Sequence, residues 1–102
     1  MAIKSFAHKG LEKFYYNGTT VGINPKHEKK LARILDAIDA SHHPVDLKNI
    51  FQHRFGEKKG AGNGVYSIEV NGNWRITFEI KDDGAVFLDY LDYHGKSIVA
   101  RS

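Results

Sequence analysis

The sequence predicts a single α+β domain in which two N-terminal helices pack on one face of a small antiparallel β-sheet. Apolar residues follow helical spacing in the first half of the chain and alternate with polar residues in the second half. Short turns containing glycine separate the alternating segments, as in a meander of antiparallel strands. At 102 residues, the chain can build one hydrophobic core but not two.

Composition and charge exclude several classes of protein. The absence of cysteine excludes disulfide scaffolds, thiolate metal sites and cysteine nucleophiles. The chain has 15 Lys and Arg against 12 Asp and Glu, and this net charge of +3 permits a polyanionic partner without requiring one. No apolar run is long enough to cross a bilayer, and the first residues lack the apolar stretch of a signal peptide. We therefore expect a cytoplasmic protein with no membrane partner.

The first half of the chain is predicted to contain a short strand and two helices. Residues 2–7 alternate loosely as a strand does, and residues 8–17 place their apolar side chains on one side of a helix. Residues 26–40 give the clearest helical pattern, with Asn24 as a cap and Pro25 in the first turn. The outer side of this helix carries Lys26, Lys29, Lys30 and Arg33. The simpler interpretation of these cations is a solvated face, and the alternative is a surface that contacts phosphates.

The middle of the chain is predicted to be less regular. Residues 41–49 are expected to form a loop with about one helical turn, because the residue before Pro44 avoids the α region. His42 and His43 are neighbours that would point in opposite directions, so we do not expect them to share a metal ion. Residues 50–55 are interpreted as a strand.

The second half is predicted to be rich in strands. Residues 65–70, 74–80 and 85–93 alternate in polarity, and turn sequences at residues 71–72 and 82–84 separate them. In the second of these strands Arg75 lies on the polar face. A guanidinium matches two phosphate oxygens and stays charged at physiological pH, so Arg75 is a candidate phosphate clamp. The alternative is an ion pair with Glu69 or Glu79.

The last predicted strand ends in titratable side chains. Asp92 and His94 share one strand face. A turn of two or four residues would place Arg75 on the same face as Asp92, whereas a turn of three residues would place it on the opposite face. A carboxylate, an imidazole and a guanidinium on one concave sheet would suit acid–base cleavage of a phosphodiester.

His53 precedes a glycine-rich loop that carries Lys58 and Lys59. The glycines would let the backbone approach phosphates and the lysines would supply charge, although a surface loop without a partner has the same composition. The loop does not match the P-loop of nucleotide triphosphatases, and no serine lies in the nucleophile motif of hydrolases. We expect no cofactor and no metal.

Three segments of the chain resemble a known family. The opening segment at residues 3–11, the sequence NWRITF at residues 73–78 and the ending DYH at residues 92–94 are similar to the HigB toxins. These toxins belong to the RelE/ParE superfamily of type II toxin–antitoxin systems. The resemblance covers residues 1–94, and we interpret residues 95–102 as a C-terminal extension of the same domain. It implies the RelE-like fold, with an antiparallel sheet and two N-terminal helices on one side.

The resemblance also implies an activity and two partners. HigB toxins are ribosome-dependent endoribonucleases that cut mRNA in the ribosomal A site, and a HigA-type antitoxin holds them inactive. By the family's pattern, the catalytic residues of this chain would be His53, Arg75, Asp92 and His94. Its RNA-binding residues would be Lys58, Lys59 and Tyr93. Arg75 would contact the phosphate, His94 would transfer protons together with His53 or Asp92, and Tyr93 would stack on or orient a base.

Two alternative functions remain open at this point. A non-catalytic toxin of the ParE kind would inhibit DNA gyrase, but several ParE-type proteins lack an acid–base set on the last strand, so the DYH ending argues against it. In a plain nucleic-acid-binding module, Arg75 would be a contact and not a catalyst. A steep salt dependence of RNA affinity without cleavage would favour that module.

Overall fold

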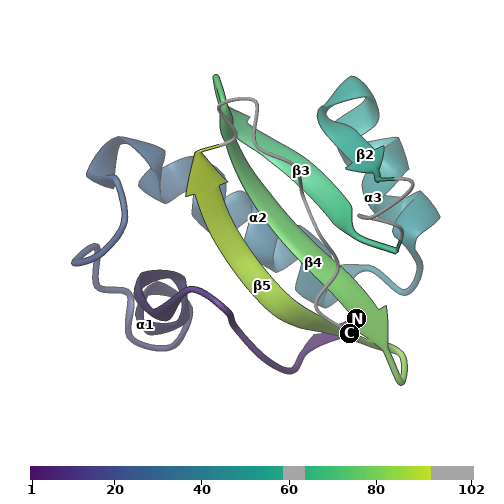
Figure 1. Ribbon diagram of the computed structural model, residues 1–102, viewed down its shortest axis with the longest axis horizontal. Coiled ribbons are helices and arrows are strands. Elements are labelled where there is room, and N and C mark those ends of the chain that lie inside the picture. Colours follow the sequence, from purple (N-terminus) through teal and green to yellow (C-terminus); the bar gives the residue numbers. More distant parts are fainter. Residues whose placement is uncertain (59–63, 93–102) are drawn as a thin grey trace.

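The computed structural model describes residues 1–58 and 64–92, and within them a five-stranded sheet has the order β1-β5-β4-β3-β2 (Figure 1). The strands are β1 (Ala2–Ile3), β2 (Phe55–Glu57), β3 (Tyr66–Asn71), β4 (Trp74–Lys81) and β5 (Gly84–Asp92). Neighbouring strands are antiparallel except β1, which runs parallel to β5 and makes the sheet mixed. The predicted α+β class is confirmed, with this parallel first strand as an addition.

Three α-helices and two short 3₁₀ turns complete the part of the chain that the structure describes. They are α1 (Lys9–Asn17), η1 (Pro25–His27), α2 (Glu28–Ala40), α3 (Pro44–Phe51) and η2 (Gln52–Arg54). The side chain of His8 caps α1 by accepting a hydrogen bond of 3.0 Å from the Leu11 N–H. Asn24 caps η1 in the same way through the Lys26 N–H. The two predicted helices are therefore present, close to their predicted ends.

The third helix, α3, corrects two predictions, namely the loop at residues 41–49 and the strand at residues 50–55. His43 is extended, with φ −139°, as a residue before proline should be, but the helix begins directly after it at Pro44. The Asp46 carboxylate accepts hydrogen bonds from the backbone N–H groups of His42 and His43, which lowers its pKa and fixes the helix start. The restriction on the residue before a proline therefore applies to His43 alone, and the residues from Pro44 onwards are free to form a helix.

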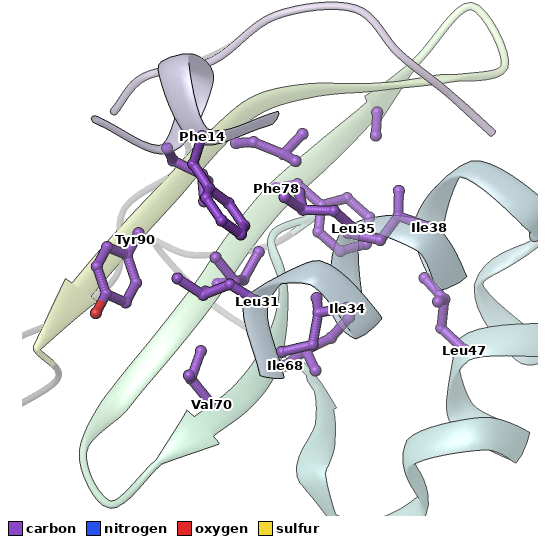
Figure 2. Close-up of a cluster of buried hydrophobic side chains, with 14 of the residues drawn as sticks. Phe14, Leu31, Ile34, Leu35, Ile38, Leu47, Ile68, Val70, Phe78 and Tyr90 are labelled. Atoms are coloured by element: carbon purple, nitrogen blue, oxygen red, sulfur yellow. The ribbon is translucent and has the colours of Figure 1, made fainter. Parts of the chain in front are cut away.

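The helices cover one face of the sheet and share a single hydrophobic core. In Figure 1, α2 lies behind β4 and β5. Figure 2 shows side chains of α2 lying among Ile68, Val70 and Phe78 of the sheet, with Phe14 from α1 and Leu47 from α3 at the edges. The buried side chains of α2 are Leu31, Ile34, Leu35 and Ile38. The predicted apolar stripe of this helix is therefore confirmed, and the sheet is left with one helix-covered face.

Gln52 has strained backbone at the end of α3. Its φ is 53° and its ψ is −121°, a combination that costs a residue with a Cβ about 1–3 kcal/mol. We expect Gln52→Gly to raise the free energy of unfolding by about 1 kcal/mol, after the entropic cost of a new glycine. Urea denaturation would measure this. Gln52→Ala keeps the Cβ and should leave the stability near that of the wild type; equal stabilisation by Ala and Gly would contradict the backbone explanation.

Candidate functional site

The candidate site lies where β4 begins and β5 ends, beside the β3–β4 turn. In the register of these strands, Arg75 is opposite Glu69 on one side and Leu91 on the other, and Asp92 is opposite Trp74. Arg75 and Asp92 therefore occupy adjacent rows of neighbouring strands. Because side chains alternate between the two faces of a sheet, Asp92 lies on the helix-covered face with Trp74, and Arg75 lies on the opposite face with Leu91.

This arrangement corrects the expectation that a two-residue turn would place Arg75 on the same face as Asp92. The turn does consist of two residues, Asp82 and Asp83, both with positive φ. However, the register shifts by one residue between Thr77 and Glu79, and Phe87 of β5 has a φ of 56° at this point. The Phe87 N–H donates to the Ser5 Oγ at 2.9 Å instead of to β4. Because this β-bulge inserts one extra residue into β5, every side chain of β5 beyond it lies on the opposite face from the one that an unbroken register would give.

The Arg75 guanidinium is held at the β3–β4 turn. Its Nη1 donates hydrogen bonds of 2.5 Å to the Gly72 carbonyl and 3.1 Å to the Trp74 carbonyl. Its Nη2 lies 3.8 Å from Glu69 Oε1, and the Arg75 side chain is 22% exposed. The alternative interpretation of Arg75 as one half of an ion pair with Glu69 is thus confirmed. An ion pair that is partly exposed and this long contributes little to stability.

His53 and Arg54 lie at the same end of the sheet, one strand further along. They belong to η2, which comes directly before β2, so the predicted place of His53 at the end of a strand is wrong. Arg54 and Glu69 line one shallow depression, and Glu69 is the residue that pairs with Arg75. These residues form a row along one end of the sheet, from η2 to the end of β5, in which Glu69 and Arg75 lie on the face away from the helices and Asp92 lies on the helix-covered face. Arg54 did not stand out in the sequence, because only its neighbour His53 matched the family's pattern.

Lys58, one of the two lysines predicted to bind RNA, lies apart from this row. Lys58 follows β2, and its N–H donates to the Val65 carbonyl at 2.8 Å. Val65 and Glu69 are four residues apart along the chain, so Lys58 lies roughly 13 Å along the sheet from the row of Arg75, at about 3.3 Å per residue. Three further predicted site residues, Lys59, Tyr93 and His94, lie outside the residues that the structure describes.

A buried histidine supports the site from the helix side. His27 is 3% exposed, and its Nδ1 lies 2.6 Å from the Tyr90 hydroxyl. The Tyr90 hydroxyl also accepts a hydrogen bond of 3.4 Å from the Asn24 N–H, so it links β5 to both His27 and the start of η1. The Trp74 ring stacks on Tyr90 with a centroid separation of 4.6 Å. Because Trp74 is the cross-strand partner of Asp92, this cluster holds the end of β5 in place. His27 was missed, although it continues the apolar stripe of α2 by one turn.

The His27 cluster predicts a pH dependence of stability. Burial, and secondly Lys30, lower the pKa of His27 below its usual value near 6.5. The unfolded chain therefore binds a proton more readily, and this stabilisation is present above about pH 6.5 and is lost as the pH falls below it. Between about pH 7.5 and about pH 5, the fall in melting temperature should be smaller for His27→Gln than for the wild type. His42→Gln, at an exposed site, should keep the wild-type fall, and a parallel decline in all three proteins would refute this assignment.

Within residues 1–58 and 64–92, no group of three His, Asp or Glu side chains is arranged to hold a metal ion. In the same residues, no helix combines the length and apolarity needed to span a bilayer. The candidate site itself offers cations, a carboxylate and an imidazole, with Arg75 and Asp92 on opposite faces of the sheet. Groups of these kinds can bind a phosphate and move protons.

Comparison with known proteins places the chain in a family. A family described as the RelE-like toxin of the type II toxin–antitoxin system HigB matches residues 4–94. The chain belongs to the HigB family. Endoribonuclease HigB from Proteus vulgaris is 37% identical over 92 residues, which are 90% of this chain and 99% of that protein. Toxin HigB-1 from Vibrio cholerae is 34% identical over 90 residues, which are 87% and 94% of the two chains.

A solved structure agrees with the fold of this HigB family member. A chain in the YoeB-YefM complex from Staphylococcus aureus superposes with a TM-score of 0.56 over 89% of this chain and 99% of that chain, at 22% sequence identity. At this identity the likeness concerns the fold alone, and the expected RelE-like fold is confirmed.

Proposed function

We propose that this chain is the toxin of a type II toxin–antitoxin pair and that it cleaves mRNA on the ribosome. The observation that carries this proposal is its similarity, along almost the whole chain, to the protein named Endoribonuclease HigB. The proposed partners are a HigA-type antitoxin and the ribosome with bound mRNA, and the proposed place of action is the cytoplasm. A ribosome would position the substrate, so weak activity on free RNA is compatible with this function.

In the proposed reaction, the ribose 2′-hydroxyl attacks the adjacent phosphorus and the bond to the 5′-oxygen breaks. The step needs a base for the 2′-proton, an acid for the leaving oxygen and a cation beside the phosphate. We assign Arg75 to the phosphate and assign proton transfer to His94 with His53 or Asp92. Lys58 and Lys59 would contact the RNA backbone, and Tyr93 would stack on or orient a base. The products are a 2′,3′-cyclic phosphate and a 5′-hydroxyl end.

Expression in a bacterial host tests this function. The wild type and the Arg75→Ala variant are induced from a tight promoter, and mRNA 5′ ends are mapped by primer extension. We expect new cuts within translated regions for the wild type, few or none for the variant, and none when translation is blocked. Growth arrest with intact transcripts would contradict the proposal and would favour a binding target such as gyrase.

A further inference from the structure

The charges of α2 are sorted onto two flanks of the helix. α2 lies between α1 and α3 (Figure 1). On the flank towards α1, Glu28 and Asp36 border a groove shared with α1, and Asp39 accepts a hydrogen bond of 2.7 Å from the Tyr15 hydroxyl. On the flank towards α3, Lys30 and Arg33 border a different depression. The outer side of α2 is therefore not uniformly basic, since Glu28 and Asp36 border α1 whereas Lys30 and Arg33 lie towards α3.

The depression on the basic flank joins α2 to the candidate site. Its rim is formed by Lys30 and Arg33 of α2, Arg54 of η2 and Glu69 of β3. Ile34, Phe51 and Val70 form its floor. The Arg33 guanidinium lies over the Phe51 ring, 5.7 Å from its centroid, which restrains the side chain without neutralising it. Glu69 also pairs with Arg75, but the Arg75 side chain lies on the opposite face of the sheet, so the depression adjoins the candidate site through η2, which carries His53.

Among the described residues, the cations of the rim have no acidic partner. Within the described part of the chain, no carboxylate forms an ion pair with Lys30, Arg33 or Arg54, whereas the one carboxylate on the rim pairs with Arg75. Lys26 adds a fourth exposed cation one turn before Lys30. At 1.5 Å per residue, the positions from Lys26 to Arg33 extend over about 10 Å of helix. Several unneutralised cations on one strip attract a polyanion and release its counterions.

The size and lining of the depression indicate that it can contact the phosphates of a nucleic acid but cannot hold a base. Its volume is about 20 Å³, enough for a water molecule or a phosphate oxygen but too small for a nucleobase. The large apolar side chains that the structure leaves exposed are Tyr16, Val21, Val45 and Ile50, and none of them lies on the rim. Single-stranded RNA is bound by stacking on exposed aromatic rings, which this surface lacks in its described residues. Folded RNA is bound through its backbone.

We propose that Lys26, Lys30, Arg33 and Arg54 form a docking strip for the phosphate backbone of folded RNA. The strip is separate from the predicted catalytic residues and lies beside them. Given the proposed function, on which this choice of RNA rests, the folded RNA is ribosomal. Docking there would hold the toxin through the side that carries α2 and η2, away from the sheet face on which Arg75 lies.

Paired variants test the docking strip. Lys30→Ala/Arg33→Ala removes two cations of the strip, and Lys9→Ala/Lys13→Ala removes two exposed cations from α1 at similar helical spacing. Binding to an RNA duplex of about 20 base pairs is measured by fluorescence anisotropy between about 50 and 200 mM salt. We expect the strip variant to bind at least about tenfold more weakly at the lower salt concentration. Its plot of log affinity against log salt concentration should also be shallower than that of the wild type, by about two units of slope. The α1 variant should keep the wild-type slope.

The docking strip would be overturned if the salt dependence of RNA affinity had the same slope in the wild type and in both double variants. It would also be overturned if the strip variant and the α1 variant lost the same amount of affinity. Arg54→Ala provides an independent readout outside α2 and should lower the slope by about one. The same variants are then sedimented with purified ribosomes, where the same ranking is expected. A wild type that binds duplex RNA through the strip but cuts no mRNA would contradict the proposed function alone. Cleavage with unchanged slopes would contradict the strip alone.

Discussion

Replacing Arg75 with alanine is expected to lower the rate of ribosome-dependent mRNA cleavage by about 10²- to 10³-fold. Two backbone carbonyls of the β3–β4 turn hold the guanidinium, so its charge is oriented before the substrate arrives. A positive group that is already in place stabilises the charge that develops on the phosphate at no cost of reorganisation. Single-turnover cleavage on purified ribosomes would measure the loss.

Two control variants separate the role of the Arg75 guanidinium from that of its neighbours. Arg75→Lys keeps the charge but not the planar fork, and we expect it to retain part of the activity. Glu69→Gln removes the ion pair of 3.8 Å and leaves the carbonyl contacts, so it should cut at least as fast as the wild type. Melting temperatures check that each variant is folded. Full cleavage by folded Arg75→Ala would exclude Arg75 from the reaction.

Replacing Gly10 with alanine is expected to lower the free energy of unfolding by about 2–3 kcal/mol. A Cβ at this position would lie 2.5 Å from the Gly22 carbonyl oxygen and 2.8 Å from its carbon, both of which belong to the backbone. The first turn of α1 therefore packs directly on the segment that leads to α2. Neither backbone can move aside cheaply, so the helix or the connection must shift. Urea denaturation with a two-state fit would give the difference.

The sign of the Gly10 effect is what makes it informative. In a helix that met no neighbour, Gly→Ala would stabilise by about 1 kcal/mol. Lys9→Ala, at an exposed position of the same helix, should change the stability by less than about 0.5 kcal/mol. A Gly10→Ala protein as stable as the wild type, or more stable, would refute the close backbone contact with Gly22.

Local sequence patterns correctly predicted the elements in which one face is buried, because burial of one face fixes the spacing of the apolar residues. The apolar stripe of α2 and the alternation of β4 each reflect one buried face, and both were correct. The third helix was missed because the rule for residues before proline was extended beyond His43. His27 was missed because a histidine next to lysines suggests a solvated position, whereas here it is buried against Tyr90.

The layout of the site depends on features that have no local sequence signal. The bulge at Phe87 decides on which face Arg75 lies, yet phenylalanine seldom adopts a positive φ, and Ser5, which accepts its N–H, comes from the other end of the chain. The depression beside Glu69 likewise joins α2, η2 and β3. Only the tertiary arrangement brings Arg33 and Arg54 to one rim. The sequence could therefore name candidate residues but could not assign them to faces.

The central claim is that this protein cuts mRNA when a ribosome presents it. The most direct measurement incubates the purified protein with one mRNA, either free or bound to purified ribosomes with an empty A site, and maps the new ends by primer extension. We predict cuts within the ribosome-bound mRNA, with 5′-hydroxyl ends, and little or no cutting of the free mRNA. Intact mRNA on the ribosome, in the presence of folded protein, would contradict the claim.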